Sequence, residues 1–213
     1  MKKAYISNNV IRRLPRYLRK LDELLRDGVE RTSSGELGSQ MGLTSSQIRQ
    51  DFSCFGEFGQ QGYGYNVRAL RGEIASILGM GKSFSAILIG VGNIGRALIG
   101  NFSFDHFGFR FLGAFEVRRD LVGGSVAGCP VMDAEDLDAF IRENNVDVAI
   151  LAVPRKSAQR VADSLIESGI RGIWNFTDVE LDAHGSGVII ENIHFSDSLL
   201  TLSYQLSAEE EER

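Results

Sequence analysis

Apolar residues recur at spacings of three and four near the start of the chain. They are Val10, Leu14, Tyr17, Leu18, Leu21, Leu24 and Leu25. This spacing predicts one apolar stripe along a helix, with the arginines of the segment largely on its other faces. Pro15 interrupts the pattern, so the helix either is kinked there or starts near it, and Gly28 ends it.

Two short polar helices are predicted next, in TSSGELGSQMGLTSSQIRQDFSCFGEFG. Ser33 and Glu36 have the spacing of a capping box, and Thr44 and Gln47 repeat it eleven residues later. A glycine turn at Gly42 separates the two helices. Two short capped helices joined in this way predict a helix-turn-helix, although any two such helices can imitate one.

The second of these helices has an apolar side and a polar side. We expect its inward positions to be Leu43, Ile48 and Phe52. We expect its outward positions, near its start, to be Ser45, Gln47, Arg49 and Gln50. Side chains there reach base edges in a DNA major groove, where Gln pairs with adenine and Arg with guanine or phosphate. The pattern therefore indicates a recognition helix.

Glycines and aromatic residues alternate in the following segment, GEFGQQGYGYNV. The glycines are Gly56, Gly59, Gly62 and Gly64, and the aromatic residues are Phe58, Tyr63 and Tyr65. Short β-prone pieces around a glycine tip predict a hairpin, the wing that lies along a minor groove or a phosphate backbone. The alternative is a linker between two domains.

Beyond residue 80, apolar runs of strand length alternate with segments of helical pattern. The expected strands are 85–90, 109–116, 146–154, 170–176 and 188–193. The expected helices are 93–102, 134–144 with Asp133 as its cap, 158–167, and a last apolar one through Leu199–Leu206. Continuous apolar runs are typical of parallel strands buried on both faces. The second half is therefore expected to be a Rossmann domain, a doubly wound parallel sheet.

A glycine-rich turn joins the first of these strands to the first helix. Gly90, Gly92 and Gly95 fit G-x-G-x-x-G, in which the glycines allow a tight turn, close approach to a pyrophosphate and helix packing. Glu116 ends the second strand, where an acid accepts hydrogen bonds from an adenosine ribose and repels a 2′-phosphate. NAD(H) is favoured, while Arg118 and Arg119 keep NADP(H) open, and such domains also bind CoA.

The charge is unevenly distributed along the 213 residues. The net charge of −5 combines a first part, residues 1–80, with a net of +4 and a remainder with a net of −9. The basic residues of the first 26 positions are Lys2, Lys3, Arg12, Arg13, Arg16, Arg19, Lys20 and Arg26. A basic first half suggests a polyanionic partner such as DNA.

Catalytic and metal-binding patterns do not emerge from the sequence. The three histidines are scattered, and the two cysteines, Cys54 and Cys129, are far apart, as in a protein of the reducing cytoplasm. Cys54 is interpreted as a small packing residue, or alternatively as a redox thiol. No membrane span or signal peptide is recognisable. We expect a nucleotide that is bound rather than used, and no enzyme activity.

Taken together, the segments resemble the Rex family of bacterial redox-sensing transcriptional repressors. The resemblance spans roughly residues 10–206 through RRLPRYLRKL, RTSSGELG, TSSQIRQDFSCFGEFG, GYGYNV, VGNIGRALIGNF and VPRKSAQRVADSLIESGIRGIWNF. It implies a homodimer of subunits with an N-terminal winged helix, a C-terminal Rossmann domain and a last helix exchanged between subunits. It also implies repression when NADH is low and release of the operator by NADH, while NAD+ competes without releasing it well.

The resemblance assigns roles to particular residues. Arg12, Ser45, Gln47, Arg49, Phe55 and Gly56 match DNA-contacting positions. The charge, recognition-helix and wing patterns add Arg13, Arg16, Gln50, Gln60, Gln61 and Tyr63. The pyrophosphate loop is matched by Gly90, Val91, Gly92, Asn93, Ile94 and Gly95, and the ribose position by Glu116. The nicotinamide side is matched by Val153, Pro154, Asn175 and Phe176.

Some positions depart from the family pattern. Gln50, Gln60 and Gln61 stand where the family commonly has bases, which predicts weaker, salt-dependent DNA affinity. Asn101 and His194 stand where the family has a Tyr and an Asp that take part in its redox-linked switch. His adds a charge that depends on pH. A DNA-binding paralogue with an altered or lost NADH response therefore remains an alternative.

Three segments are expected: a winged helix-turn-helix domain over 1–80, an NAD(H)-binding Rossmann domain over 81–195 and a dimer-exchange helix with an acidic tail over 196–213. The leading hypothesis is a repressor that binds double-stranded DNA and senses the NADH/NAD+ ratio. A small NAD-dependent oxidoreductase is the alternative from another class, although the chain leaves no residues for a substrate domain.

Overall fold

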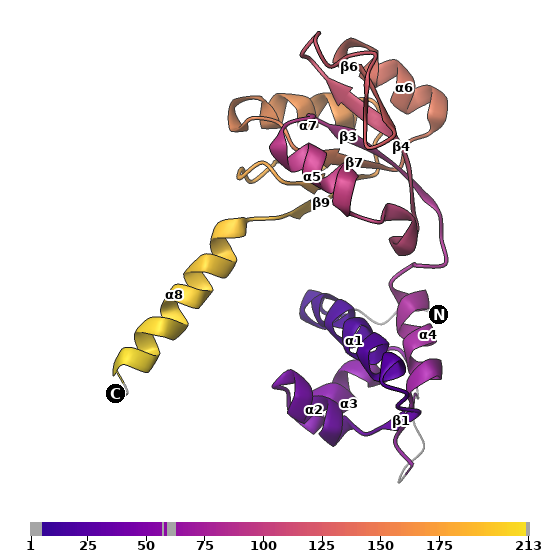
Figure 1. The fold of residues 1–213 in the computed structure, drawn as a ribbon, viewed down its shortest axis with the longest axis vertical. Helices are drawn as coiled ribbons and strands as arrows, with labels where there is room; N and C mark the ends of the chain where they lie inside the picture. The colour runs from indigo at the N-terminus through magenta and orange to yellow at the C-terminus, as the bar shows by residue number, and fades with distance from the viewer. Residues whose placement is uncertain (1–5, 57, 59–62, 212–213) are drawn as a thin grey trace. The chain divides into compact units, whose positions relative to one another are not determined.

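The computed structural model describes residues 6–56, 58 and 63–211. The chain divides into two units, Met1–Gly81 and Lys82–Arg213 (Figure 1). Each unit has its own hydrophobic core. The first unit is mainly helical, and the second is built on a parallel sheet.

Four helices and a two-stranded sheet make up the described part of the first unit. The helices are α1 (Asn8–Arg26), α2 (Ser34–Met41), α3 (Ser45–Ser53) and α4 (Val67–Ile77). The antiparallel strands are β1 (Arg31–Thr32) and β2 (Tyr65–Asn66). Neither β1 nor α4 is among the elements expected from the sequence.

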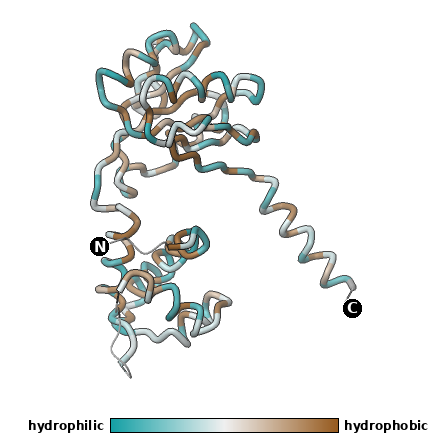
Figure 2. The backbone as a smooth tube through the Cα atoms, turned by 180° about the vertical axis from the view of Figure 1, so that it is seen from behind, coloured by the Kyte–Doolittle hydropathy of each residue, from teal (hydrophilic) through white to brown (hydrophobic). Residues whose placement is uncertain are grey.

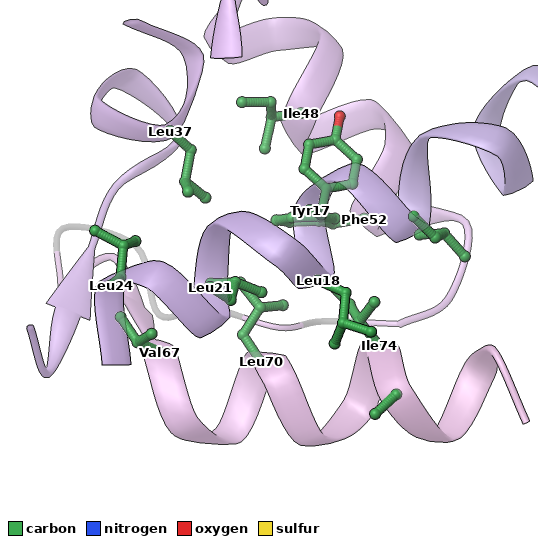
Figure 3. Packing of buried hydrophobic residues seen from close by; sticks show 12 residues of the cluster. Tyr17, Leu18, Leu21, Leu24, Leu37, Ile48, Phe52, Val67, Leu70 and Ile74 are labelled. Carbon is green, nitrogen blue, oxygen red and sulfur yellow. The ribbon is translucent and has the colours of Figure 1, made fainter. Parts of the chain in front are cut away.

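Helix α1 lies in the centre of this unit. Its buried residues are Val10, Leu14, Tyr17, Leu18, Leu21 and Leu24, as the periodicity predicts. Burying a leucine side chain contributes about 1.5–3 kcal/mol, so this stripe holds the unit together. Figure 3 shows it between α4 on one side and Leu37 and Ile48 on the other. The helix runs through Pro15, so the expectation that it starts near this residue is wrong.

Both helices of the helix-turn-helix begin at a hydroxyl cap. At Ser33 the capping box is complete, because Glu36 also accepts a hydrogen bond from the Ser33 backbone N–H. At Thr44 only half of the box forms: the hydroxyl accepts from the Gln47 backbone, but the Gln47 side chain donates to Asp51 instead. The second capping box is therefore a wrong prediction.

The described part of the predicted wing contributes the strand β2, which pairs with β1 rather than with the residues just after α3. Gly64 makes this pairing possible, since its φ is +67° and an added Cβ would lie 2.5 Å from the carbonyl oxygen of Thr32. The tip of the predicted hairpin, with Gly59, Gln60, Gln61 and Gly62, lies outside the described residues.

A seven-stranded sheet forms the centre of the second unit. Its strands are β3 (Phe84–Ile89), β4 (Phe109–Glu116), β5 (Ser125–Val126), β6 (Cys129–Asp133), β7 (Val148–Leu151), β8 (Gly172–Asn175) and β9 (Ile189–Asn192). The order is β5-β6-β4-β3-β7-β8-β9, and only β5 is antiparallel to its neighbour. The six parallel strands thus follow the order 3-2-1-4-5-6 of the Rossmann fold, which confirms the predicted fold class.

Helices cover both faces of this sheet. Helix α5 (Asn93–Asn101) packs on one face through Leu98 and Ile99. Helices α6 (Leu137–Asn144) and α7 (Ala158–Glu167) pack on the other. Three short 3₁₀ turns complete the unit: η1 (Phe104–Phe107), η2 (Ala134–Asp136) and η3 (Arg155–Ser157). Asp133 caps η2, one turn before α6, by accepting from the backbone N–H of Glu135.

The last helix, α8 (Phe195–Glu211), exposes its apolar side chains. Phe195, Leu199, Leu202 and Leu206 have the spacing of one helical stripe, and each is at least half exposed. Leu200 and Tyr204 are also exposed, on another face. In Figure 2, hydrophobic and hydrophilic residues alternate along this helix. The predicted exchange of this helix between subunits stays a prediction.

Candidate functional site

The turn between β3 and α5 has, at its first glycine, the tight backbone conformation that the G-x-G-x-x-G motif predicts. Gly90 has a φ of +96°, and an added Cβ would lie 2.5 Å from the carbonyl oxygen of Ala152. Its backbone N–H donates a 2.9 Å hydrogen bond to the carbonyl oxygen of Phe115. Only glycine suits this position, because the left-handed backbone and the neighbouring strand both exclude a side chain.

The other two glycines differ in what surrounds them. A Cβ on Gly95 would collide with the carbonyl oxygen of Gly90 and lie 3.0 Å from Leu88, so this glycine lets α5 approach β3. Gly92 caps α5 without a side-chain bond, and an added Cβ there would meet nothing within 4 Å. The first N–H groups of α5 have no acceptor within the helix, which makes this end a suitable anion site.

Glu116, at the end of β4, holds the glycine turn in place. The carboxylate is buried, and its Oε2 accepts a 2.8 Å hydrogen bond from the backbone N–H of Val91. Its Oε1 accepts hydrogen bonds from the backbone N–H groups of Val117 and Arg118, at 2.8 and 3.1 Å. The predicted ribose acid is therefore also a structural link between β4 and the turn.

A cavity of about 890 Å³ opens at this end of the sheet. The carboxyl ends of β3, β4 and β7 line it, at the point where the strand order reverses, which is where doubly wound sheets bind nucleotides. The predicted cofactor residues that line it are Gly90, Gly92, Asn93, Ile94, Glu116, Val153 and Pro154. Val91 and Gly95 are buried beside it.

Sequence reasoning did not identify several residues of the cavity wall. Ser157 ends the turn η3, Arg160 and Ser164 lie on α7, and Arg118 follows β4. Arg118 was considered only for NADP(H). A usable signal for the others was their place directly after Val153 and Pro154, because the segment after a parallel strand borders the same edge of the sheet.

Asn175 and Phe176 do not line this cavity. Asn175 is buried, and its Nδ2 donates to the carbonyl of Val179 and to Oδ1 of Asn192. Its Oδ1 accepts from Thr177. Phe176 packs edge-on against Trp174, with ring centroids 4.6 Å apart. Their predicted place on the nicotinamide side stays a prediction.

The two candidate switch residues have separate partners. The Asn101 side chain donates to the carbonyl of Ala97, one turn earlier in α5. The His194 ring lies 3.1 Å from Glu180 and 3.6 Å from Asp178, just before α8. The hydrogen bond to Glu180 raises the pKa of His194. No hydrogen bond joins Asn101 to His194 within the described chain.

In the first unit, α3 presents polar side chains at its surface. Arg49 and Gln50 are exposed, while Ser45 and Gln47 are half-buried. One guanidinium N–H of Arg49 donates to the Ser34 hydroxyl at 3.0 Å, which joins α3 to the start of α2. On α1, Arg16 is exposed and donates to the carbonyl of Met41 at the end of α2.

A buried carboxylate connects α3 to α1. Asp51 is fully buried, and its two oxygens accept hydrogen bonds from Arg13, Tyr17 and Gln47. Burial raises the pKa of Asp51, but the hydrogen bonds from Arg13, Tyr17 and Gln47 outweigh it and lower the pKa overall. Burial, together with the bond to Asp51, raises the pKa of Tyr17. The hydrophobic pattern of α3 does not indicate that this aspartate is buried.

The remaining DNA candidates have varied surroundings. Arg13 is held by Asp51 through both Nε and Nη2, so it has a structural role besides its predicted DNA contact. Phe55 packs against the core, Arg12, Gly56 and Tyr63 are exposed, and Gln60 and Gln61 lie outside the described residues. The DNA contacts of all these residues stay predictions.

The other chemistry-bearing groups are few. Cys54 is exposed at the end of α3, so its interpretation as a packing residue is wrong, and Cys129 is buried with its pKa raised by burial to about 11. In the described ranges, three or more potential metal ligands do not gather anywhere. Among the described residues, every helix is too short or too polar to span a bilayer.

Two family models match parts of the chain. Residues 81–179 match the model described as "CoA binding domain". Residues 5–53 match the model described as "Putative DNA-binding protein N-terminus". The two matches fall on the glycine-turn unit and on the helix-turn-helix unit.

Relatives resemble the chain over almost its full length. The redox-sensing transcriptional repressor Rex of Clostridium tetani is 49% identical, with 99% of both chains covered. That of Caldanaerobacter subterraneus is 48% identical, covering 98% of this chain and 93% of its own.

Solved structures agree with these relatives. A crystal structure of RSP in complex with β-NAD+ and operator DNA has a TM-score of 0.90 and 48% identity, covering 97% of this chain and 95% of its own. A structure of RSP with β-NADH has a TM-score of 0.90 and 45% identity, covering 97% of each chain. The two-unit fold, the glycine turn and these relatives agree, and the chain belongs to the Rex family of redox-sensing transcriptional repressors.

Proposed function

We propose that this protein is a transcriptional repressor that binds operator DNA when NADH is low and releases it when NADH binds. One observation carries the proposal: a single chain combines a helix-turn-helix with a nucleotide cavity at the switch point of a Rossmann sheet. Its likeness to a repressor solved with β-NAD+ and operator DNA, and again with β-NADH, supports both halves.

The sensed ligand is NAD(H). The N–H groups at the start of α5 receive the pyrophosphate, with Gly92 leaving room for it. Glu116 keeps one acceptor position on Oε2 for an adenosine ribose, because three backbone N–H groups use the other positions of its carboxylate. Val153 and Pro154 extend the cavity toward the nicotinamide. The family model that matches this domain is described as a CoA binding domain, and Arg118 and Arg119 keep NADP(H) open. Both CoA and NADP(H) are therefore competing ligands in the test.

Double-stranded DNA is the partner of the first unit. Ser45, Gln47, Arg49 and Gln50 face the major groove, while Arg12, Arg13 and Arg16 of α1 neutralise phosphates. Phe55, Gly56 and Tyr63 are further proposed DNA contacts, as are Gln60 and Gln61, which lie outside the described residues. Arg12 and Arg16 are exposed and are more direct phosphate contacts than Arg13, because Arg13 is held by Asp51.

The acting form is a homodimer in which α8 is exchanged. The exposed apolar stripe of α8 supports this, since a helix of this kind needs a surface to cover it. Nucleotide binding acts as a signal rather than as catalysis, because the full-length relatives are repressors. We place the protein in the cytoplasm, where its DNA lies.

NADH acts by favouring one of two arrangements of the units. A ligand shifts such an equilibrium only through its different affinity for the two arrangements. His194 lies directly before α8, the proposed interface helix, and Asn101 ends α5, the helix whose start borders the cavity. They replace the Tyr and Asp that the family resemblance implies for the switch.

Fluorescence anisotropy on a palindromic A/T-rich operator duplex tests the proposal. NADH and NAD+ are titrated at fixed salt, with NADPH and CoA as further arms. We expect tight binding that NADH alone releases. Tight binding indifferent to both forms of NAD would instead support the paralogue with a different signal, and turnover of NADH with carbonyl substrates would support an oxidoreductase.

A further inference from the structure

We propose that Asp51 is a specificity-determining positioning residue, which fixes the side-chain amide of Gln47 so that α3 reads adenine in preference to guanine. The inference rests on the proposed function, because it needs Gln47 to meet a base. It concerns a residue that lies beneath the DNA-facing surface of α3.

The Asp51 carboxylate has no free acceptor position. Its Oδ1 accepts from Arg13 Nη2 at 2.8 Å and from Gln47 Nε2 at 2.9 Å. Its Oδ2 accepts from Arg13 Nε at 2.6 Å and from the Tyr17 hydroxyl at 2.7 Å. Four donors on two oxygens leave no room for a water or a base to displace Gln47.

The orientation of the Gln47 amide is chemically determined. An ionised carboxylate only accepts hydrogen bonds, so the amide must turn its nitrogen, and not its oxygen, toward Asp51. The ion pair with Arg13 keeps the Asp51 carboxylate ionised. Gln47 and Asp51 are also one helical turn apart on α3, a spacing that brings their side chains together.

The remaining edge of the amide matches adenine. One N–H of Gln47 is used by Asp51, which leaves one N–H and the carbonyl oxygen Oε1. Oε1 accepts no hydrogen bond from the part of the chain that the structure describes. One donor beside one acceptor complements adenine N7 and N6–H₂, whereas guanine presents two acceptors, N7 and O6. An unrestrained glutamine can turn both N–H groups outward and donate them to N7 and O6 of guanine.

Tyr17 and Arg13 keep the aspartate itself in place. Both lie on α1, and the Tyr17 ring packs edge-on against Phe52 with centroids 5.0 Å apart. Asp51 therefore cannot follow a rotation of Gln47 without breaking bonds to the core. In this arrangement the core of the unit determines which edge of the Gln47 amide α3 presents to a base.

The test measures base discrimination with the full-length protein. Operator duplexes with each A·T pair replaced by G·C identify the position at which Gln47→Ala removes the preference. At that position we expect wild-type protein to favour adenine about 5- to 150-fold, the range of a good bidentate contact. Asp51→Asn, which offers an N–H to Gln47 and lets the amide turn, should reduce this ratio several-fold and leave other positions unchanged.

An equal loss of affinity for all duplexes, or an unchanged ratio of adenine to guanine, would overturn the inference. A merely structural role of Asp51 would lower the affinity for every duplex equally. Should Asp51→Asn fail to fold, a duplex with 7-deazaadenine at the Gln47 position tests the same edge on wild-type protein. Full affinity for that duplex would also overturn the inference. Wild-type protein that binds no operator would instead refute the proposed function itself.

Discussion

The backbone N–H of Val91 donates a 2.8 Å hydrogen bond to Oε2 of Glu116, which joins the glycine turn to the end of the neighbouring strand. The acid that we expect to meet the ribose thus also holds the turn that we expect to meet the pyrophosphate. Both halves of the nucleotide site are therefore positioned by one carboxylate before any ligand arrives.

Replacing Glu116 by alanine should lower NADH affinity and remove the preference for NADH over NADPH. The substitution frees the Val91 N–H and removes the negative charge that repels a 2′-phosphate. Equilibrium fluorescence titration with each nucleotide measures both effects. Glu143→Ala, an exposed glutamate of α6, serves as the control. An unchanged NADH/NADPH ratio in Glu116→Ala would contradict the ribose assignment.

Gly95→Ala should lower the stability of the protein, whereas Gly92→Ala should weaken its binding of NADH. Alanine at 95 collides with the Gly90 carbonyl, so we expect a loss of about 1–3 kcal/mol in the free energy of unfolding, as overpacking gives. Alanine at 92 has open space and should fold normally, but lose NADH affinity on the order of tenfold or more. Thermal unfolding and NADH titration separate the two. Tight NADH binding by Gly92→Ala would place the pyrophosphate elsewhere.

The stability of the first unit should fall in acid through Asp51. Its pKa is lowered in the folded protein, so its contribution is present above the unfolded pKa of about 4 and is lost as the pH falls through the folded value. Asp51→Ala should cost about 3–5 kcal/mol near neutral pH, because it leaves Arg13 without its buried partner. Chemical unfolding from pH 7 to pH 3 measures both. A variant as stable as wild type at pH 7 would show that the pair contributes little.

His194 should give the opposite pH dependence. Its pKa is raised by the hydrogen bond to Glu180, so the stabilisation is full below the ordinary histidine value of about 6.5 and is lost as the pH rises through the folded value. NMR titration of the ring should show the midpoint falling in Glu180→Gln. In His194→Gln, the difference in unfolding temperature between acid and alkaline pH should shrink. An unchanged midpoint would indicate that the ion pair does not form in solution.

The exposed stripe of α8 should be required for dimerisation. Leu199→Asp places a charge on this stripe and should shift the protein toward monomer in analytical ultracentrifugation. Thr201→Asp adds the same charge away from the stripe and is the matched control. Equal effects of the two substitutions, or a dimer in both, would remove α8 from the proposed interface.

The regular parts of the fold were predictable because their signals are local. The strand Phe109–Glu116 and the helix Ala158–Glu167 have the predicted bounds, since a continuous apolar run and a helical periodicity each extend over the whole element. Strand β1 was missed because two residues carry no period, and it exists only by pairing with Tyr65–Asn66.

The sequence predicted which residue types form the sites better than it predicted the hydrogen bonds between distant residues. The glycine turn follows from three residues in one short segment, whereas the burial of Asp51 depends on Arg13, 38 positions away. A charged residue on a polar helix is usually exposed, so the sequence alone favours the wrong environment. The partial capping box at Thr44 has the same cause, because Asp51 attracts the Gln47 side chain away from the backbone.

The shared carboxylate also has an evolutionary consequence. Gln47 cannot be exchanged for another base-reading residue without leaving one acceptor position of Asp51 empty, and Asp51 cannot change without releasing Arg13 and Tyr17. Substitutions at these positions are therefore expected to be epistatic. A lineage that adopts a different base at this operator position would need paired substitutions in α1 and α3. A protein with only one of the paired substitutions would be less stable.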